Sequence, residues 1–187
     1  MQFTATDLAG AWVIELKRIE DHRGFFARSW CEKEFLEHGL DPRVSQRNVG
    51  YNHKRGTLRG LHFQVAPDLE AKVLSVTRGA VYDVIVDLRP DSATFCHWIG
   101  VELSADNRRM LYAPAGFAHG YQTLVDETEL QYLATAPFAP KSARGVRFDD
   151  PALRISWPLP VTAMSDADRN WPALDRQSLD FSASQPS

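Results

Sequence analysis

The sequence predicts an all-β fold, a sandwich or barrel of short strands. The first indication is the alternation over residues 81–88, which places Tyr82, Val84, Val86 and Leu88 on one face of a strand and Val81, Asp83, Ile85 and Asp87 on the other. The second is a series of further apolar segments, at 72–77, 99–103, 119–124 and 129–134, separated by turn residues such as Gly79 and Pro90. Short strands at this spacing are typical of antiparallel sandwiches and barrels.

The remaining elements are few. Ser29 and Glu32 have the spacing of a capping box and predict a helix start. Phe35, Leu36 and Leu40 would follow on one helical stripe, with Gly39 suited to end the helix. After residue 150, prolines divide the chain into short segments around two tryptophans. We therefore expect one domain over residues 1–175 and a weakly ordered polar tail over 176–187.

Composition narrows the class of function. The chain has 187 residues and a formal net charge of −3, so it offers no broad basic surface for nucleic acid, although a few placed cations would suffice for an anionic small molecule. No apolar run approaches the ~20 residues of a membrane helix. The two cysteines, Cys31 and Cys96, suggest neither a disulfide framework nor a zinc site. Without a signal-peptide pattern at the N-terminus, the expected location is the cytoplasm.

The densest cluster of reactive side chains is 56–64, where Gly60 separates Arg59 from His62. A regular strand would send these two side chains to opposite faces, and a bulge at Gly60 would bring them together. His62 is then a candidate general base, because an imidazole titrates near neutral pH. The alternative is a hydrogen-bonded core histidine without chemistry.

A second histidine, His119, follows a turn and opens a predicted strand. Two histidines that reach the interior of a β-barrel from different strands can bind a metal, and Glu70 is the candidate third ligand. The loose spacing of these three residues makes the set a weak metal signature. A metal-dependent oxygenase or isomerase is therefore one hypothesis for this chain.

Three further side chains have both a structural and a chemical interpretation. Tyr132 shares a predicted face with Leu130 and Ala134, so it is either core or a proton donor across a cavity. Lys72 is either an exposed residue at a strand end or a cation that stabilises an oxyanion. Asp83 lies in an apolar strand, where a buried carboxylate needs a partner such as an imidazole.

Seven motifs occur in order over about residues 12–172: Arg23-Gly-Phe-Phe, Gln46-Arg-Asn, Leu58-Arg-Gly-Leu-His-Phe-Gln, Asp83-Val-Ile-Val-Asp-Leu-Arg, Leu103-Ser-Ala-Asp-Asn, Pro114-Ala-Gly-Phe-Ala-His-Gly and Ile155-Ser-Trp-Pro. Together they resemble the dTDP-4-dehydrorhamnose 3,5-epimerase family of sugar-nucleotide epimerases. The resemblance implies a cupin-type β jelly roll with short peripheral helices, a homodimer, and chemistry with no metal and no organic cofactor. The implied reaction inverts C3, with or without C5, of a nucleotide-linked 4-keto-6-deoxy sugar in deoxysugar or surface-polysaccharide biosynthesis.

The resemblance also assigns roles. His62 matches the base, Asp168 the carboxylate that pairs with it, Tyr132 the acid, and Lys72 and Arg59 the positions near the keto oxygen. His119 and Asp83 match further residues of the cavity. The positions that hold nucleotide and sugar are matched by Arg23, Phe26, Gln46 and Asn48. Arg23 and Phe26 belong to a segment that, in the family, completes the neighbouring subunit's site.

Three residues depart from the family pattern. Arg28 stands where thymidine-specific members tend to carry Glu, and Glu70 stands where many have Gln. Phe138 replaces a usual tyrosine of the cavity, which bears on substrate choice and on the number of centres inverted. Arg28 and Phe138 therefore keep open a keto-isomerase or an epimerase for GDP- or CDP-linked sugars. A non-catalytic binding module is disfavoured, because binding alone needs no paired base and acid.

Overall fold

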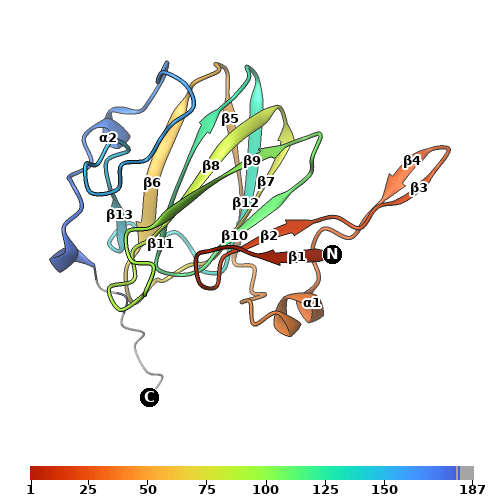
Figure 1. Ribbon diagram of the computed structural model, residues 1–187, viewed down its shortest axis with the longest axis horizontal. Helices are drawn as coiled ribbons and strands as arrows, with labels where there is room; N and C mark the ends of the chain where they lie inside the picture. Colours follow the sequence, from red (N-terminus) through yellow and green to blue (C-terminus); the bar gives the residue numbers. More distant parts are fainter. Residues whose placement is uncertain (180, 182–187) are drawn as a thin grey trace.

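The computed structural model describes residues 1–179 and 181, which form two antiparallel sheets packed face to face (Figure 1). The six-stranded sheet has the order β1 (Gln2–Ala5), β2 (Trp12–Glu15), β10 (Met110–Ala113), β7 (Lys72–Arg78), β12 (Thr128–Ala134) and β5 (Gln46–Asn52). The five-stranded sheet has the order β13 (Ala143–Gly145), β6 (Leu58–Gln64), β11 (Phe117–Thr123), β8 (Ala80–Asp87) and β9 (Trp98–Ser104). The predicted all-β class is confirmed.

Alternation along the strands produces the core between the sheets. On β8, Val81 and Ile85 face inward and pack against Leu74 of β7 and Leu130 of β12, and all four are at most 1% exposed. The other face of β8 carries Val84 and Val86, and Leu88 directly after the strand continues it; as the alternation predicts, these residues belong to a separate cluster. Each sheet therefore has two apolar faces, and its outer face needs a second cover.

Short segments cover these outer faces. The helix α1 (Glu32–Glu37) places Phe35 against Ile14 and Met110 on the six-stranded sheet. The segment after β13 places Val146 and Leu153 on the five-stranded sheet. The latter segment also contains the helix α2 (Asp166–Arg169) and the 3₁₀ turn η1 (Arg176–Ser178).

The predicted capping box at the start of α1 is wrong. The N-cap is Cys31, which makes no side-chain capping hydrogen bond, so Ser29 lies outside the helix. Because no side chain caps this short helix, the packing of the fully buried Phe35 stabilises it instead. Leu36 is 59% exposed, so the expected stripe is only partly buried. Gly39 ends the helix with φ +70°, as expected.

The bulge expected at Gly60 is present. In the pairing of β6 with β11, His62 lies opposite His119 but Arg59 lies opposite Tyr121, so β6 contains one extra residue. A Cβ at Gly60 would lie 2.6 Å from Gly120 Cα and 2.7 Å from the His119 carbonyl oxygen, so this position requires glycine. The extra residue turns Arg59 and His62 to the same side of the sheet.

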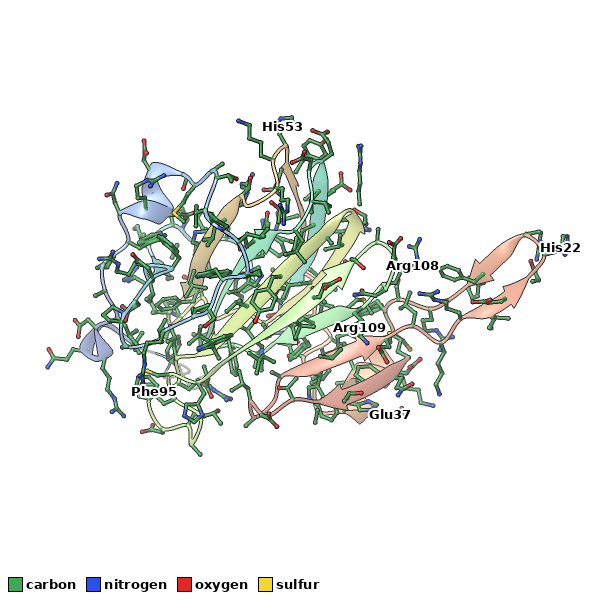
Figure 2. All side chains as sticks on the ribbon, turned by 45° about the horizontal axis from the view of Figure 1, so that its top comes forward. His22, Glu37, His53, Phe95, Arg108 and Arg109 are labelled. Carbon is green, nitrogen blue, oxygen red and sulfur yellow. The ribbon has the colours of Figure 1, made fainter. Side chains whose placement is uncertain are left out.

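A two-stranded hairpin, β3 (Ile19–Asp21) and β4 (Gly24–Phe26), projects away from both sheets (Figure 1). His22 lies at its tip, and Arg108 of the sandwich lies near its base (Figure 2). Phe25 packs between the guanidinium groups of Arg18 and Arg108, at 4.9 and 5.1 Å. These contacts join the hairpin to the sandwich through Arg108.

The start of the expected tail is ordered, because Leu179 is 9% exposed and joins the cluster under the C-terminal segment. Residues 180 and 182–187 of that tail lie outside the described residues, so the boundary at residue 175 stays a prediction. In the described part of the chain, no helix has the length and apolarity needed to cross a membrane.

Candidate active site

A cavity of about 580 Å³ opens between the two sheets. One wall is formed by β5, β7 and β12 of the six-stranded sheet, and the facing wall by β6 and β11. Of the predicted site residues, those that line it are Gln46, Asn48, Arg59, His62, Lys72, His119, Tyr132 and Phe138. The residues proposed for chemistry therefore meet in one place although they come from five strands and a loop.

His62 is held by a carboxylate from the far end of the chain. Its Nε2 lies 2.6 Å from Asp168 Oδ1. Burial opposes ionisation of Asp168, but the hydrogen bonds from His62, the Gly60 amide and Trp171 keep the pKa of that carboxyl below its usual 3.8. An ionised carboxylate can only accept, so His62 Nε2 carries the hydrogen and Nδ1 is left free to take a proton.

Local structure fixes Asp168 in this position. It lies in α2, whose N-cap Ser165 accepts a hydrogen bond from the Asp168 amide at 3.0 Å. Trp171 donates from Nε1 to the same carboxylate at 3.3 Å and lies edge-on to the His62 ring. The predicted pairing of His62 with Asp168 is thus present in the geometry, and Trp171 is a supporting residue that sequence reasoning missed.

Tyr132 reaches the cavity from the opposite sheet. It faces inward with Leu130, as the alternation in β12 predicts. Burial raises the pKa of its hydroxyl, the negative charge of Glu70 and the neighbouring Tyr121 raise it further, and a hydrogen bond with Asn48 opposes them. Tyr132 is therefore protonated at neutral pH, which is the state that a proton donor needs.

Lys72 is buried and lies inside the cavity, which rules out the exposed alternative. Its side chain is 10% exposed, and its Nζ lies 2.9 Å from Glu70 Oε1. The same Nζ lies 5.9 Å from the centre of the Tyr132 ring. The cavity therefore holds a cation next to the candidate acid, with a carboxylate as the counter-ion.

His119 is paired with Asp83 at the base of the site. Its Nε2 lies 3.0 Å from Asp83 Oδ2, and Asp83 is fully buried. Burial raises the pKa of Asp83, against the attraction of His119 and Lys72. The other carboxylate oxygen, Oδ1, is buried without a hydrogen-bond partner among the described residues. His119 is therefore the imidazole partner that we expected for a carboxylate buried in an apolar strand.

The metal hypothesis fails on geometry. Its three candidate ligands are engaged in three separate pairs, His62 with Asp168, His119 with Asp83 and Glu70 with Lys72. Within residues 1–179 and 181, no three histidine, cysteine, aspartate or glutamate side chains are grouped as a metal site would need. The residues present therefore do not fit a metal-dependent cupin enzyme.

Arg59 is positioned by a buried polar pair. Its Nε donates to Asn52 Oδ1 at 2.8 Å, and Asn52 Nδ2 donates to the Tyr121 hydroxyl at 3.2 Å. Tyr121 is 5% exposed and lines the cavity, and burial raises its pKa. Alternation does not single out Tyr121, because every residue of β11 is buried.

Phe138 lies at the rim of the cavity. It is 64% exposed, and its amide donates to the side chain of Gln46. Gln46, Asn48 and Phe138 thus form one edge of the opening. The Phe138 departure therefore lies in the lining of the cavity that holds the candidate base and acid.

Arg23, Phe26 and Arg28 lie outside this chain's cavity. Arg23 pairs with Asp21 within the projecting hairpin, and Phe26 is 73% exposed. Arg28 pairs with Glu34 at 2.9 Å beside the chain's N-terminus. A single chain therefore does not bring these three residues to its own site.

Comparison with known proteins identifies the family. The family model described as dTDP-4-dehydrorhamnose 3,5-epimerase matches residues 5–176. The chain belongs to this epimerase family. A dTDP-4-dehydrorhamnose 3,5-epimerase from Methanothermobacter thermautotrophicus is 42% identical over 92% of this chain and 94% of the relative.

Solved structures agree with this membership. The crystal structure of dTDP-4-dehydrorhamnose 3,5-epimerase from Bacillus anthracis, with TDP and pyrophosphate bound, is 42% identical, with a TM-score of 0.89 over 92% of this chain and 99% of that one. ChmJ, a 3'-monoepimerase from Streptomyces bikiniensis in complex with dTDP-quinovose, is 36% identical, with a TM-score of 0.83 over 90% and 85%. These relatives confirm the expected jelly roll of the epimerase family.

Proposed function

We propose that this protein inverts C3, with or without C5, of a dTDP-linked 4-keto-6-deoxy sugar. The observation that carries the proposal is the placement of a paired base, His62 with Asp168, and a proton donor, Tyr132, on opposite walls of one cavity. An epimerase needs this arrangement, because it removes a proton from one face of a carbon and returns one to the other face. The family membership and the dTDP-sugar ligands of solved relatives support the same reaction.

The chemistry follows from the substrate's keto group. A C–H bond next to a carbonyl can lose its proton because the electron pair moves to oxygen as an enolate. In the proposal His62 Nδ1 takes this proton, and Asp168 stabilises the imidazolium that forms. Lys72 and Arg59 offset the charge on the enolate oxygen. Tyr132 then donates its proton to the opposite face of the carbon, and the keto group is restored.

The N-terminal hairpin supports a homodimer in this proposal. Ile19 and Phe26 on the hairpin are 69% and 73% exposed, and apolar side chains on a projecting element favour packing against another chain. A second copy would then receive Arg23 and Phe26 at its cavity, where a cation and an aromatic ring can hold a phosphate and stack a base. We also propose the cytoplasm as the compartment, a proposal supported by unpaired Cys31 and Cys96.

The test is proton NMR in D₂O with dTDP-4-keto-6-deoxyglucose, following deuterium incorporation at C3 and C5 separately and trapping products by reduction. Wild-type enzyme should exchange and invert C3, and His62→Ala should abolish both while keeping the fold. His53→Ala is the matched control, because the His53 side chain is 80% exposed at one end of the sandwich (Figure 2). Near-native turnover in His62→Ala would contradict the proposed base.

The same assay separates the alternatives left open by Phe138 and Arg28. Exchange at both carbons would establish a 3,5-epimerase. Exchange at C3 alone would establish a mono-epimerase, the class of the ChmJ relative. Phe138→Tyr should then raise exchange at C5, because Phe138 lines the rim where a hydroxyl would meet the sugar. Activity with GDP- or CDP-linked sugars and none with dTDP sugars would overturn the proposed nucleotide.

A further inference from the structure

Glu70 is a carboxylate inside the cavity to which the reaction proposed above assigns no role. It lies in the segment between β6 and β7, and its side chain is 11% exposed. Its Oε1 lies 2.9 Å from Lys72 Nζ. Among the Lys or Arg pairs with carboxylates in the described residues, it is the pair in which neither side chain is more than 11% exposed.

The pair lies next to the candidate acid. Lys72 and Tyr132 extend inward from neighbouring strands, β7 and β12, with 5.9 Å between Nζ and the ring centre. Glu70 and Tyr121 raise the pKa of Tyr132, Asn48 hydrogen-bonds to it from β5, and the Lys72 ammonium lies beside its ring. Glu70 is the negative charge in this set, and its effect on the phenol opposes that of Lys72.

Glu70 stands where many members of the family have Gln, so this chain adds a negative charge next to Lys72. The ammonium would stabilise the enolate, but the same positive charge would also stabilise the Tyr132 phenolate and so lower the pKa of the phenol. A carboxylate paired with the ammonium removes this conflict. It leaves a hydrogen-bond donor at the lysine and reduces the net charge that Tyr132 experiences.

We propose that Glu70 is a positioning residue that anchors the Lys72 ammonium in the cavity and keeps the proton on Tyr132 until the enolate forms. Glu70 makes no contact with the reacting carbon in this scheme and acts through its two neighbours. The role rests on the proposed epimerase activity, in which Tyr132 is the acid.

Glu70→Gln tests the charge at constant shape. The amide oxygen can still accept from Lys72, so the packing is retained and only the negative charge is lost. NMR titration of isotope-labelled tyrosine rings, with the Tyr132 signal assigned from Tyr132→Phe, reports the ionisation directly and without substrate. The Tyr132 pKa should fall by on the order of one unit. Glu102→Gln is the matched control, because Glu102 is exposed on the edge strand β9.

The kinetic test compares inversion with exchange at C3. Loss of the Glu70 charge should leave exchange intact, because His62 and Lys72 are retained, while inversion weakens as pH rises. Their ratio should drop by roughly tenfold on the alkaline side, in line with one pKa unit. A purely structural role would lower both rates together and would not shift the pH profile. Glu70→Ala, which also removes the anchor, should in addition lower exchange.

The outcomes separate the two proposals. A Tyr132 titration in Glu70→Gln that coincides with the wild-type titration would overturn the role of Glu70, even in an active enzyme. Wild-type protein that neither exchanges nor inverts the sugar would overturn the proposed function. Even then, a Tyr132 titration that differs between Glu70→Gln and the wild type would establish the electrostatic coupling of Glu70 to Tyr132.

Discussion

Replacing Asp168 by asparagine should slow proton removal from C3 without disturbing the fold. Asp168 accepts hydrogen bonds from His62 Nε2 at 2.6 Å, the Gly60 amide at 3.3 Å and Trp171 Nε1 at 3.3 Å. Asparagine has the same shape and can still accept through its oxygen, but it carries no charge. The change therefore converts the short bond to His62 from charge-assisted to neutral.

The size of the effect follows from that one bond. A hydrogen bond to a charged group contributes about 1.5–3 kcal/mol, and that contribution grows as His62 becomes an imidazolium in the transition state. Since 1.36 kcal/mol corresponds to tenfold in rate, we expect deuterium exchange at C3 to slow by roughly 10- to 150-fold. The assay is proton NMR in D₂O under single-turnover conditions.

Asp166→Asn is the matched control, because Asp166 is an exposed carboxylate in the same short helix. It should leave the exchange rate unchanged. An exchange rate in Asp168→Asn within about threefold of the wild type would refute the assignment of Asp168 as the partner of the base.

The same substitution predicts a change in acid stability. The pKa of Asp168 is lower in the folded protein than its usual 3.8, so its ionised form favours folding above that value. This contribution is lost as pH falls below the usual value and through the lowered one. Urea unfolding between neutral pH and pH ~3 should show a smaller acid-dependent loss in Asp168→Asn than in the wild type.

Three further substitutions test other parts of the molecule. Tyr132→Phe should retain deuterium exchange at C3 but lose roughly 10²–10⁴-fold in inversion, measured from trapped products; normal inversion would exclude Tyr132 as the acid. Gly60→Ala should lower the free energy of unfolding by roughly 2–6 kcal/mol in urea, from strain at positive φ plus contact with β11. Gly24→Ala is its control, since φ there is also positive but nothing lies within 4 Å; equal losses would show that the contact contributes nothing. Arg23→Ala should raise KM for the nucleotide sugar and leave the unfolding midpoint unchanged; an unchanged KM would exclude Arg23 from the completed site.

Sequence patterns predict the parts of the site that lie on regular strands. Alternation in β12 points Tyr132 inward with Leu130, and Gly60 marks the bulge that joins Arg59 to His62. In both cases the period of the strand determines the direction of the side chain. The five strands predicted over 72–134 are present, each within one or two residues of its expected bounds.

The missed features depend on contacts between distant segments. Trp171 supports Asp168 from a segment that lacks regular periodicity. Tyr121 lies in a strand in which every residue is buried, so alternation does not distinguish it from its neighbours. The start of α1 is set by the packing of Phe35 on the outer face of the six-stranded sheet, and Ser29 makes no capping hydrogen bond there. Lys72 and Glu70 are only two residues apart, but the sequence does not reveal that both are buried, because the facing strands cover them.

The pairing of His62 with Asp168 joins residues 106 positions apart, so the base is completed by a segment that follows every strand of the chain's two sheets. During synthesis on a ribosome, every strand of both sheets, through Gly145 of β13, emerges before Asp168 does. All strands are therefore available for pairing while the imidazole still lacks its carboxylate. Premature termination between these two points would remove the partner of the base together with part of the cover of the five-stranded sheet, so one C-terminal segment completes both the active site and the core.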